Sequence, residues 1–89
     1  MATDAQALEA YRQLRPYYSG LDSAELASLD DGIEAGEPQL ALSWLIAATN
    51  EPGVSVPQSE LLDAFALLSD DDKEEYRGLL DSPNVTKAA

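Results

Sequence analysis

Residues 38–48 (PQLALSWLIAA) limit most strongly how this chain can fold. Proline is favoured at the first position of a helix, because its missing N–H would have no helical partner there. Apolar side chains then lie on nearly every side of the predicted helix: Leu40, Ala41, Leu42, Trp44, Leu45, Ile46 and Ala48. A helix that is apolar almost all round is covered by other elements. We therefore predict a central helix, with Trp44 in the middle of the core.

Apolar side chains at helical spacing predict four further helices, at residues 4–15, 24–36, 58–68 and 70–81. Ser69 and the three aspartates after it are typical of a helix start. Two prolines and a glycine in residues 51–57 exclude a helix there. No segment predicts a convincing strand. The fold class is therefore all-α, a bundle of four to five helices around a central apolar helix, in a single domain at residues 1–81. Residues 82–89 are expected to be a flexible tail.

The composition excludes most catalytic and metal-binding chemistry. The chain has no cysteine and no histidine, which removes disulfides, thiolate–zinc sites and the usual general base. An EF-hand alignment of SLDDGIEAGE with Gly32 at the turn puts Leu29 and Ala27 where carboxylate ligands are needed. There is also no glycine-rich phosphate loop and no basic patch. We expect a protein that is not an enzyme and that has no cofactor.

The sequence also bears on location. No basic stretch followed by an apolar stretch is visible at the amino end, so no signal peptide is expected. The apolar run at residues 40–48 is far shorter than a membrane span. A cytoplasmic protein is therefore expected.

The acidic residues are unevenly placed and give the best indication of function. The net charge is −12, and residues 16–72 contain 12 acidic residues and no basic one. Such a charge repels nucleic acid and anionic membranes and steers basic proteins toward the chain. A purely solubilising surface would have the same composition. If the charge is functional, the candidate partner-binding residues are Glu25, Asp30, Asp31, Glu34, Glu37 and Glu51, with Tyr17 as an exposed aromatic anchor.

The predicted helix at residues 24–36 carries much of this charge. Its apolar residues are Leu26, Leu29 and Ile33. We assign Asp30, Asp31 and Glu34 to the opposite side, exposed to solvent. Asp30 and Glu34 are four residues apart, so their charges repel each other in an isolated helix. This acidic face is the predicted contact for a basic partner.

Residues 30–68, DDGIEAGEPQLALSWLIAATNEPGVSVPQSELLDAFALL, resemble the Maf-type immunity proteins of bacterial polymorphic toxin systems. The matching positions are Gly36, Glu37, Leu40, Ala41, Leu42, Leu45, Glu51, Val54 and Val56. The resemblance implies a protein that binds and inactivates a cognate toxin inside the producing cell. Many such toxins are nucleases with basic substrate grooves, which an acidic inhibitor can occlude.

Other interpretations stay open. A nucleic-acid-mimicking inhibitor of a phage or restriction system, or an acidic adaptor, would have a similar charge. The stretch GLDSAEL resembles the phosphopantetheine attachment site of acyl carrier proteins, with Ser23 at the position of the modified serine. The spacing to the later elements differs from that of carriers, and a role for Ser23 as a helix N-cap explains it as well.

Overall fold

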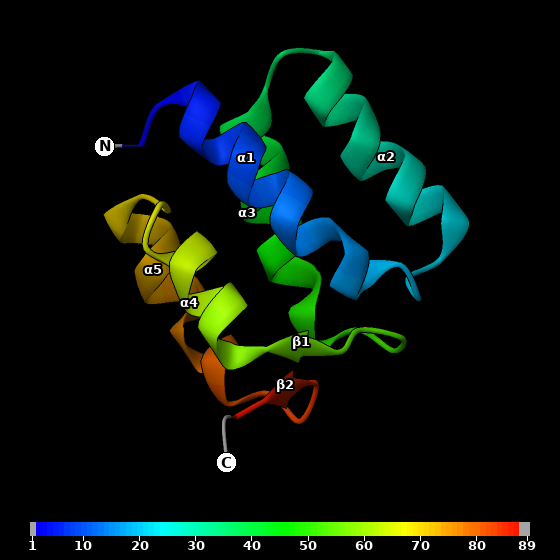
Figure 1. Ribbon diagram of the computed structural model, residues 1–89, viewed down its shortest axis with the longest axis vertical. Helices are drawn as coiled ribbons and strands as arrows, with labels where there is room; N and C mark the ends of the chain where they lie inside the picture. The colour runs from blue at the N-terminus through cyan, green and yellow to red at the C-terminus, as the bar shows by residue number, and fades with distance from the viewer. Residues whose placement is uncertain (1, 88–89) are drawn as a thin grey trace.

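Residues 2–87, the part of the chain that the computed structural model describes, form five α-helices (Figure 1). These are α1 (Asp4–Leu14), α2 (Ser23–Glu34), α3 (Pro38–Ala47), α4 (Gln58–Phe65) and α5 (Asp70–Tyr76). Three 3₁₀ turns extend them: η1 (Arg15–Tyr18), η2 (Ala48–Asn50) and η3 (Arg77–Asp81). The predicted all-α class is confirmed. No helix within residues 2–87 has both the length and the apolar character needed to cross a membrane.

Short-range hydrogen bonds fix where these helices begin. Thr3 and Gln6 form a capping box at the start of α1. Ser69 caps α5, as the sequence indicated, by accepting a hydrogen bond from the backbone N–H of Asp72 at 3.2 Å. Asp22, rather than Ser23, caps α2 through the backbone N–H of Ala24 at 3.1 Å. The N-cap assignment of Ser23 was therefore wrong by one residue, and Ser23 is the first residue of the helix.

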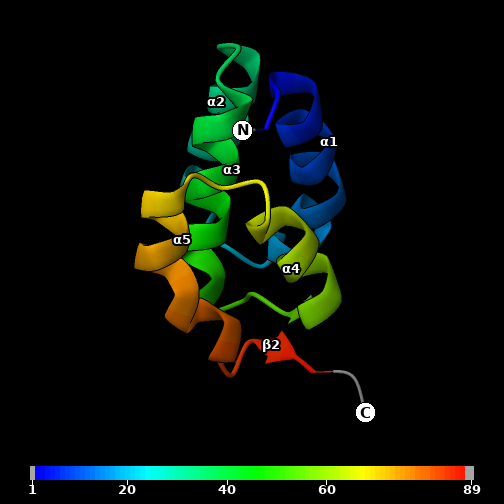
Figure 2. The same cartoon turned by 90° about the vertical axis from the view of Figure 1, so that its left-hand side faces the viewer.

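Helix α3 is the central element of the bundle. It contacts each of the other four helices, and in Figure 2 it runs between α5 and α1. Its fully buried apolar side chains are Ala41, Leu42, Leu45 and Ile46. The prediction of a central apolar helix is confirmed, but the placement of Trp44 is wrong. Trp44 is 47% exposed, because it lies on the one strip of α3 that the neighbouring helices leave uncovered.

A buried hydroxyl pair links η1, which follows α1, to η2, which follows α3. Tyr18 and Thr49 are both fully buried, and their hydroxyl oxygens lie 2.6 Å apart. Since Thr49 donates its proton to the carbonyl of Ile46, Tyr18 is the donor to Thr49. Burial raises the pKa of Tyr18 to about 12. Both buried polar groups are thus satisfied within the core.

Two short strands form a parallel pair that the sequence did not predict. Strand β1 (Val56–Pro57) pairs with β2 (Val85–Thr86), and the backbone N–H of Val56 donates to the carbonyl of Asn84 at 3.0 Å. Val56 and Val85 are both buried. The pairing therefore extends the core to the C-terminal segment.

Side chains of the C-terminal segment also hold the turn after α3. The amide of Asn84 donates to the carbonyls of Thr49 at 2.9 Å and Glu51 at 2.8 Å. Ser82 is buried and donates to the side chain of Asn50 at 2.8 Å. The predicted boundary of the domain at residue 81 and the flexible tail are therefore wrong for residues 82–87, which belong to the packed domain. The last two residues of that predicted tail, 88–89, lie outside the described part of the chain.

Gly20 and Gly53 allow the loop that follows η1 and the loop that follows η2 to come into contact. A Cβ atom on Gly20 would overlap the carbonyl group of Gly53, and the converse holds for Gly53, whose φ is +92°. The backbone N–H of Ser55 donates to the carbonyl of Tyr17 at 3.1 Å beside this contact. Only glycine fits at both positions, and the contact fixes the turn that precedes β1.

Candidate partner-binding surface

The uncovered strip of α3 is the most unusual surface of the protein. Leu40 and Trp44 are 42% and 47% exposed, and Ala47 is exposed one turn further along. These residues follow helical spacing, so they lie on one side of α3. Among the six aromatic residues of the chain, Trp44 is the one that is exposed. An exposed tryptophan within an apolar strip is typical of an interaction surface.

A groove of about 430 Å³ lies beside Trp44, between α2 and α3. Leu29 and Ala48 are buried and form its floor, and Trp44 forms one wall. The remaining lining residues are Glu25, Ser28, Ala47 and Glu51. No lysine or arginine lines the groove. We call these seven residues the Trp44 groove.

The two carboxylates that line the groove come from different elements. Glu25 lies in the first turn of α2, where the helix dipole favours a negative charge. Glu51 follows η2, and its backbone N–H donates to the carbonyl of Ala48 at 2.9 Å. The ion pairs within residues 2–87 are Arg15–Asp30, Arg77–Glu74 and Lys87–Asp81. Glu25 and Glu51 therefore have no cationic partner in the described part of the chain.

This arrangement fits the side chain of a lysine or an arginine. The cation would lie over the indole ring of Trp44, an interaction worth about 0.5–2 kcal/mol depending on desolvation. The carboxylates of Glu25 and Glu51 would accept its hydrogen bonds, which are stronger when both groups are charged. The aliphatic stem would pack on the apolar floor. The groove thus offers the negative charge and the apolar surface that a basic side chain can contact.

The prediction that Asp30 belongs to an exposed acidic face is wrong. Its Oδ1 accepts hydrogen bonds from the Tyr11 hydroxyl at 2.7 Å and from Arg15 Nε at 3.1 Å, and its Oδ2 accepts one from Arg15 Nη2 at 2.8 Å. The helical spacing explains this orientation, since Asp30 is four residues after Leu26 and three before Ile33. It therefore borders the apolar side of α2 and faces α1.

These contacts shift the titration of all three groups. The Arg15 hydrogen bond is the main cause that lowers the pKa of Asp30. The same contact raises the pKa of Arg15. Burial, followed by the contact with Asp30, raises the pKa of Tyr11. Asp30 is thus engaged within the protein, and we remove it from the candidate partner-binding residues.

The structure separates the other predicted residues. Asp31, Glu34 and Glu37 are exposed, at or beyond the middle of α2. Glu34 lies nine residues after Glu25, about 14 Å along the helix, so one basic side chain cannot reach both. Tyr17 is partly buried against the core and is not the exposed anchor that the sequence suggested. Of the predicted residues, Glu25 and Glu51 are brought together in one groove.

The sequence reasoning missed Trp44 as a surface residue. Its helix is apolar all round, and no pattern in the residues marks the strip that stays uncovered. Within residues 2–87 there is no group of three or more aspartate and glutamate side chains placed to hold a metal ion. Comparison of the chain with protein-family models, with curated proteins and with solved structures found no match in any of the three.

Proposed function

We propose that this protein binds a basic protein partner without catalysing a reaction, and that it does so through the Trp44 groove. The observation that carries the proposal is a half-exposed tryptophan that lines one groove together with Glu25 and Glu51, a groove that no basic residue lines. The surrounding charge supports it. Residues 16–72 contain 12 acidic residues and no basic one, so the field steers a basic protein toward this part of the chain.

The specific form of the proposal is an immunity protein that neutralises a cognate toxin inside the producing cell. The resemblance over residues 30–68 spans the whole of α3 and includes Glu51. Occupying a basic substrate site requires only complementary shape and charge. A tryptophan at the centre of such a contact would supply much of the binding energy, since tryptophan and tyrosine are enriched among residues that dominate interfaces.

Co-expression with the product of the adjacent gene tests this function. The groove variant is Glu25→Gln with Glu51→Gln, and the matched control is Asp31→Asn with Glu34→Gln, which removes the same charge from exposed positions outside the groove. We expect the wild type and the control to copurify with the neighbouring protein and to protect cells from it. The groove variant should do neither. Equal protection by both double variants would contradict the Trp44 groove as the site.

The same experiment separates the competing functions. A neighbouring protein that is harmless and does not copurify would contradict the immunity role. Loss of binding in the control rather than in the groove variant would favour a nucleic-acid mimic that uses the carboxylates along α2. Covalent attachment of phosphopantetheine to Ser23 by a carrier-protein synthase, detected by mass spectrometry, would support the carrier interpretation and contradict the proposal.

A further inference from the structure

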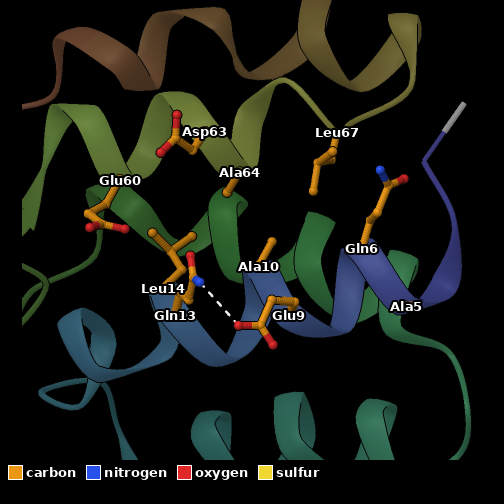
Figure 3. Close-up of a pocket in the computed structure, with 10 residues that line it drawn as sticks. All are labelled: Ala5, Gln6, Glu9, Ala10, Gln13, Leu14, Glu60, Asp63, Ala64 and Leu67. Carbon is orange, nitrogen blue, oxygen red and sulfur yellow. Dashed lines mark hydrogen bonds between the residues drawn. The ribbon is translucent and has the colours of Figure 1, made fainter.

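A second groove lies between α1 and α4 and shares no residue with the Trp44 groove. Its volume is about 410 Å³. Figure 3 shows the ten residues that line it, Ala5, Gln6, Glu9, Ala10, Gln13 and Leu14 from α1 and Glu60, Asp63, Ala64 and Leu67 from α4 or the turn after it. We call it the α1–α4 groove. Its floor and its charged rim are made of other residues than those of the Trp44 groove, so we consider its occupant separately.

The floor is apolar because small residues stand where the two helices face each other. Ala10, Leu14, Ala64 and Leu67 point into the space between α1 and α4 in Figure 3. Leu14 and Ala64 are buried, whereas Ala10 and Leu67 are partly exposed. Two alanines on facing helices leave room that larger side chains would fill. The groove is therefore open to apolar side chains from outside the chain.

The rim of this groove is negative. Glu9 lies on the α1 side, where Gln13 donates a hydrogen bond to it at 3.1 Å, and Glu60 and Asp63 lie on the α4 side. No lysine or arginine lines the groove, and none of these three carboxylates has an ion-pair partner within residues 2–87. A basic occupant is thus matched in charge on both sides of an apolar floor.

We propose that the α1–α4 groove binds an amphipathic helical segment of a partner protein, with aliphatic side chains on the floor and lysine or arginine beside them. From Ala5 to Leu14 the α1 wall is about 14 Å long, enough for two to three turns of a helix. Such segments dock through apolar residues at positions i, i+3 or i+4, and i+7. A second copy of this chain is disfavoured, since its net charge of −12 would repel the rim. The inference does not rest on the Trp44 groove.

The probe is a synthetic acetylated peptide of about twelve residues, with leucine at helical spacing and lysine elsewhere. One comparison peptide replaces the leucines with serine, and another replaces the lysines with glutamate. Titration into ¹⁵N-labelled protein should shift the amide resonances of residues 5–14 and 60–67. The affinity for the leucine–lysine peptide should exceed that for either comparison peptide at least tenfold.

Two variants test the floor and the rim separately. Ala10→Leu fills the floor and should weaken binding at least tenfold, whereas Ala27→Leu adds the same side chain at an exposed position of α2 and should leave it unchanged. Glu60→Gln with Asp63→Asn should weaken binding and flatten its dependence on salt. Asp31→Asn with Glu34→Gln, the matched charge control, should not. Thermal unfolding shows whether each variant is folded. If Ala10→Leu does not fold, the rim variant alone tests the proposal.

Several results would overturn the inference. They are the absence of binding, equal binding of the serine-substituted peptide, and amide shifts confined to other elements. Sedimentation showing that the protein self-associates, with loss of that association in Ala10→Leu, would assign the groove to a second copy instead. Because Trp44 does not line this groove, its fluorescence reports the other site independently, and the two proposals can fail separately.

Discussion

Arg15 and Asp30 form a two-point ion pair that ties the end of α1 to the middle of α2. Arg15 Nε lies 3.1 Å from Asp30 Oδ1 and Arg15 Nη2 lies 2.8 Å from Oδ2. Tyr11 adds a third hydrogen bond to the same carboxylate. Asp30 is half exposed, so solvent weakens the pair, but its bidentate geometry places it at the upper end of exposed pairs. This contact, rather than an acidic face, defines the role of Asp30.

The first prediction concerns the stability that this contact supplies. Asp30→Asn should lower the free energy of unfolding by about 1 kcal/mol, because the charge-assisted hydrogen bonds from Arg15 are weakened. Asp31→Asn is the control, because Asp31 is exposed and its substitution removes the same charge at the next position. Urea unfolding followed by circular dichroism measures both. Equal stability of the two variants would show that the ion pair contributes nothing.

The second prediction is a pH dependence. The pKa of Asp30 is lowered in the folded protein from its ordinary value of 3.8, so the unfolded chain takes up the proton first. The stability from this group is therefore fully present above about pH 4 and is lost as the pH falls through the lowered pKa. The difference in unfolding free energy between wild type and Asp30→Asn should shrink over this range. A difference that stays constant down to pH 2 would contradict the assignment.

The third prediction contrasts two neighbours on α3. Leu45 is fully buried, so Leu45→Ala should lower the free energy of unfolding by about 2–5 kcal/mol. Trp44 already exposes nearly half of its surface, so Trp44→Ala should lower it by about 1–1.5 kcal/mol. The melting temperatures of the two variants show which substitution destabilises the protein more. A larger loss of unfolding free energy for Trp44→Ala than for Leu45→Ala would contradict the exposed position of Trp44.

The fourth prediction concerns the contact between Gly20 and Gly53. Gly20→Ala should destabilise the protein by more than about 2 kcal/mol, because the new methyl group meets backbone atoms that cannot move without disturbing the turn. Gly78→Ala is the control. A Cβ atom there meets nothing within 4 Å, and alanine in η3 should be neutral or stabilising by up to about 1 kcal/mol. Similar melting temperatures for both variants would mean that the two loops do not touch.

The sequence predicted the helical class and the central position of α3, because both follow from local spacing and from a helix with too few polar residues to face water. It misplaced Trp44, because which strip of an all-round apolar helix stays exposed depends on where the other helices lie. It misassigned Asp30 because the partner, Arg15, lies 15 residues earlier and the position borders the apolar side of α2.

The contacts of the C-terminal segment, residues 82–87, could not be predicted from local sequence either. The pairing of Val85 with Val56 and the bonds from Asn84 to the turn after α3 join residues that are far apart in the chain. Nothing in the local composition of residues 82–87 indicates this contact. Within the candidate site, Glu25 and Glu51 were identified from charge alone, while the groove between them depends on how α2 packs on α3.

The most direct test of the Trp44 groove uses the only tryptophan of the chain as its own probe. Titration with a hexa-arginine peptide at low salt should change the Trp44 emission in a saturable way. Glu25→Gln with Glu51→Gln should weaken the apparent affinity at least tenfold, and Asp31→Asn with Glu34→Gln should leave it nearly unchanged. An emission that does not respond, or an affinity that falls equally in both double variants, would contradict a basic-side-chain site at Trp44.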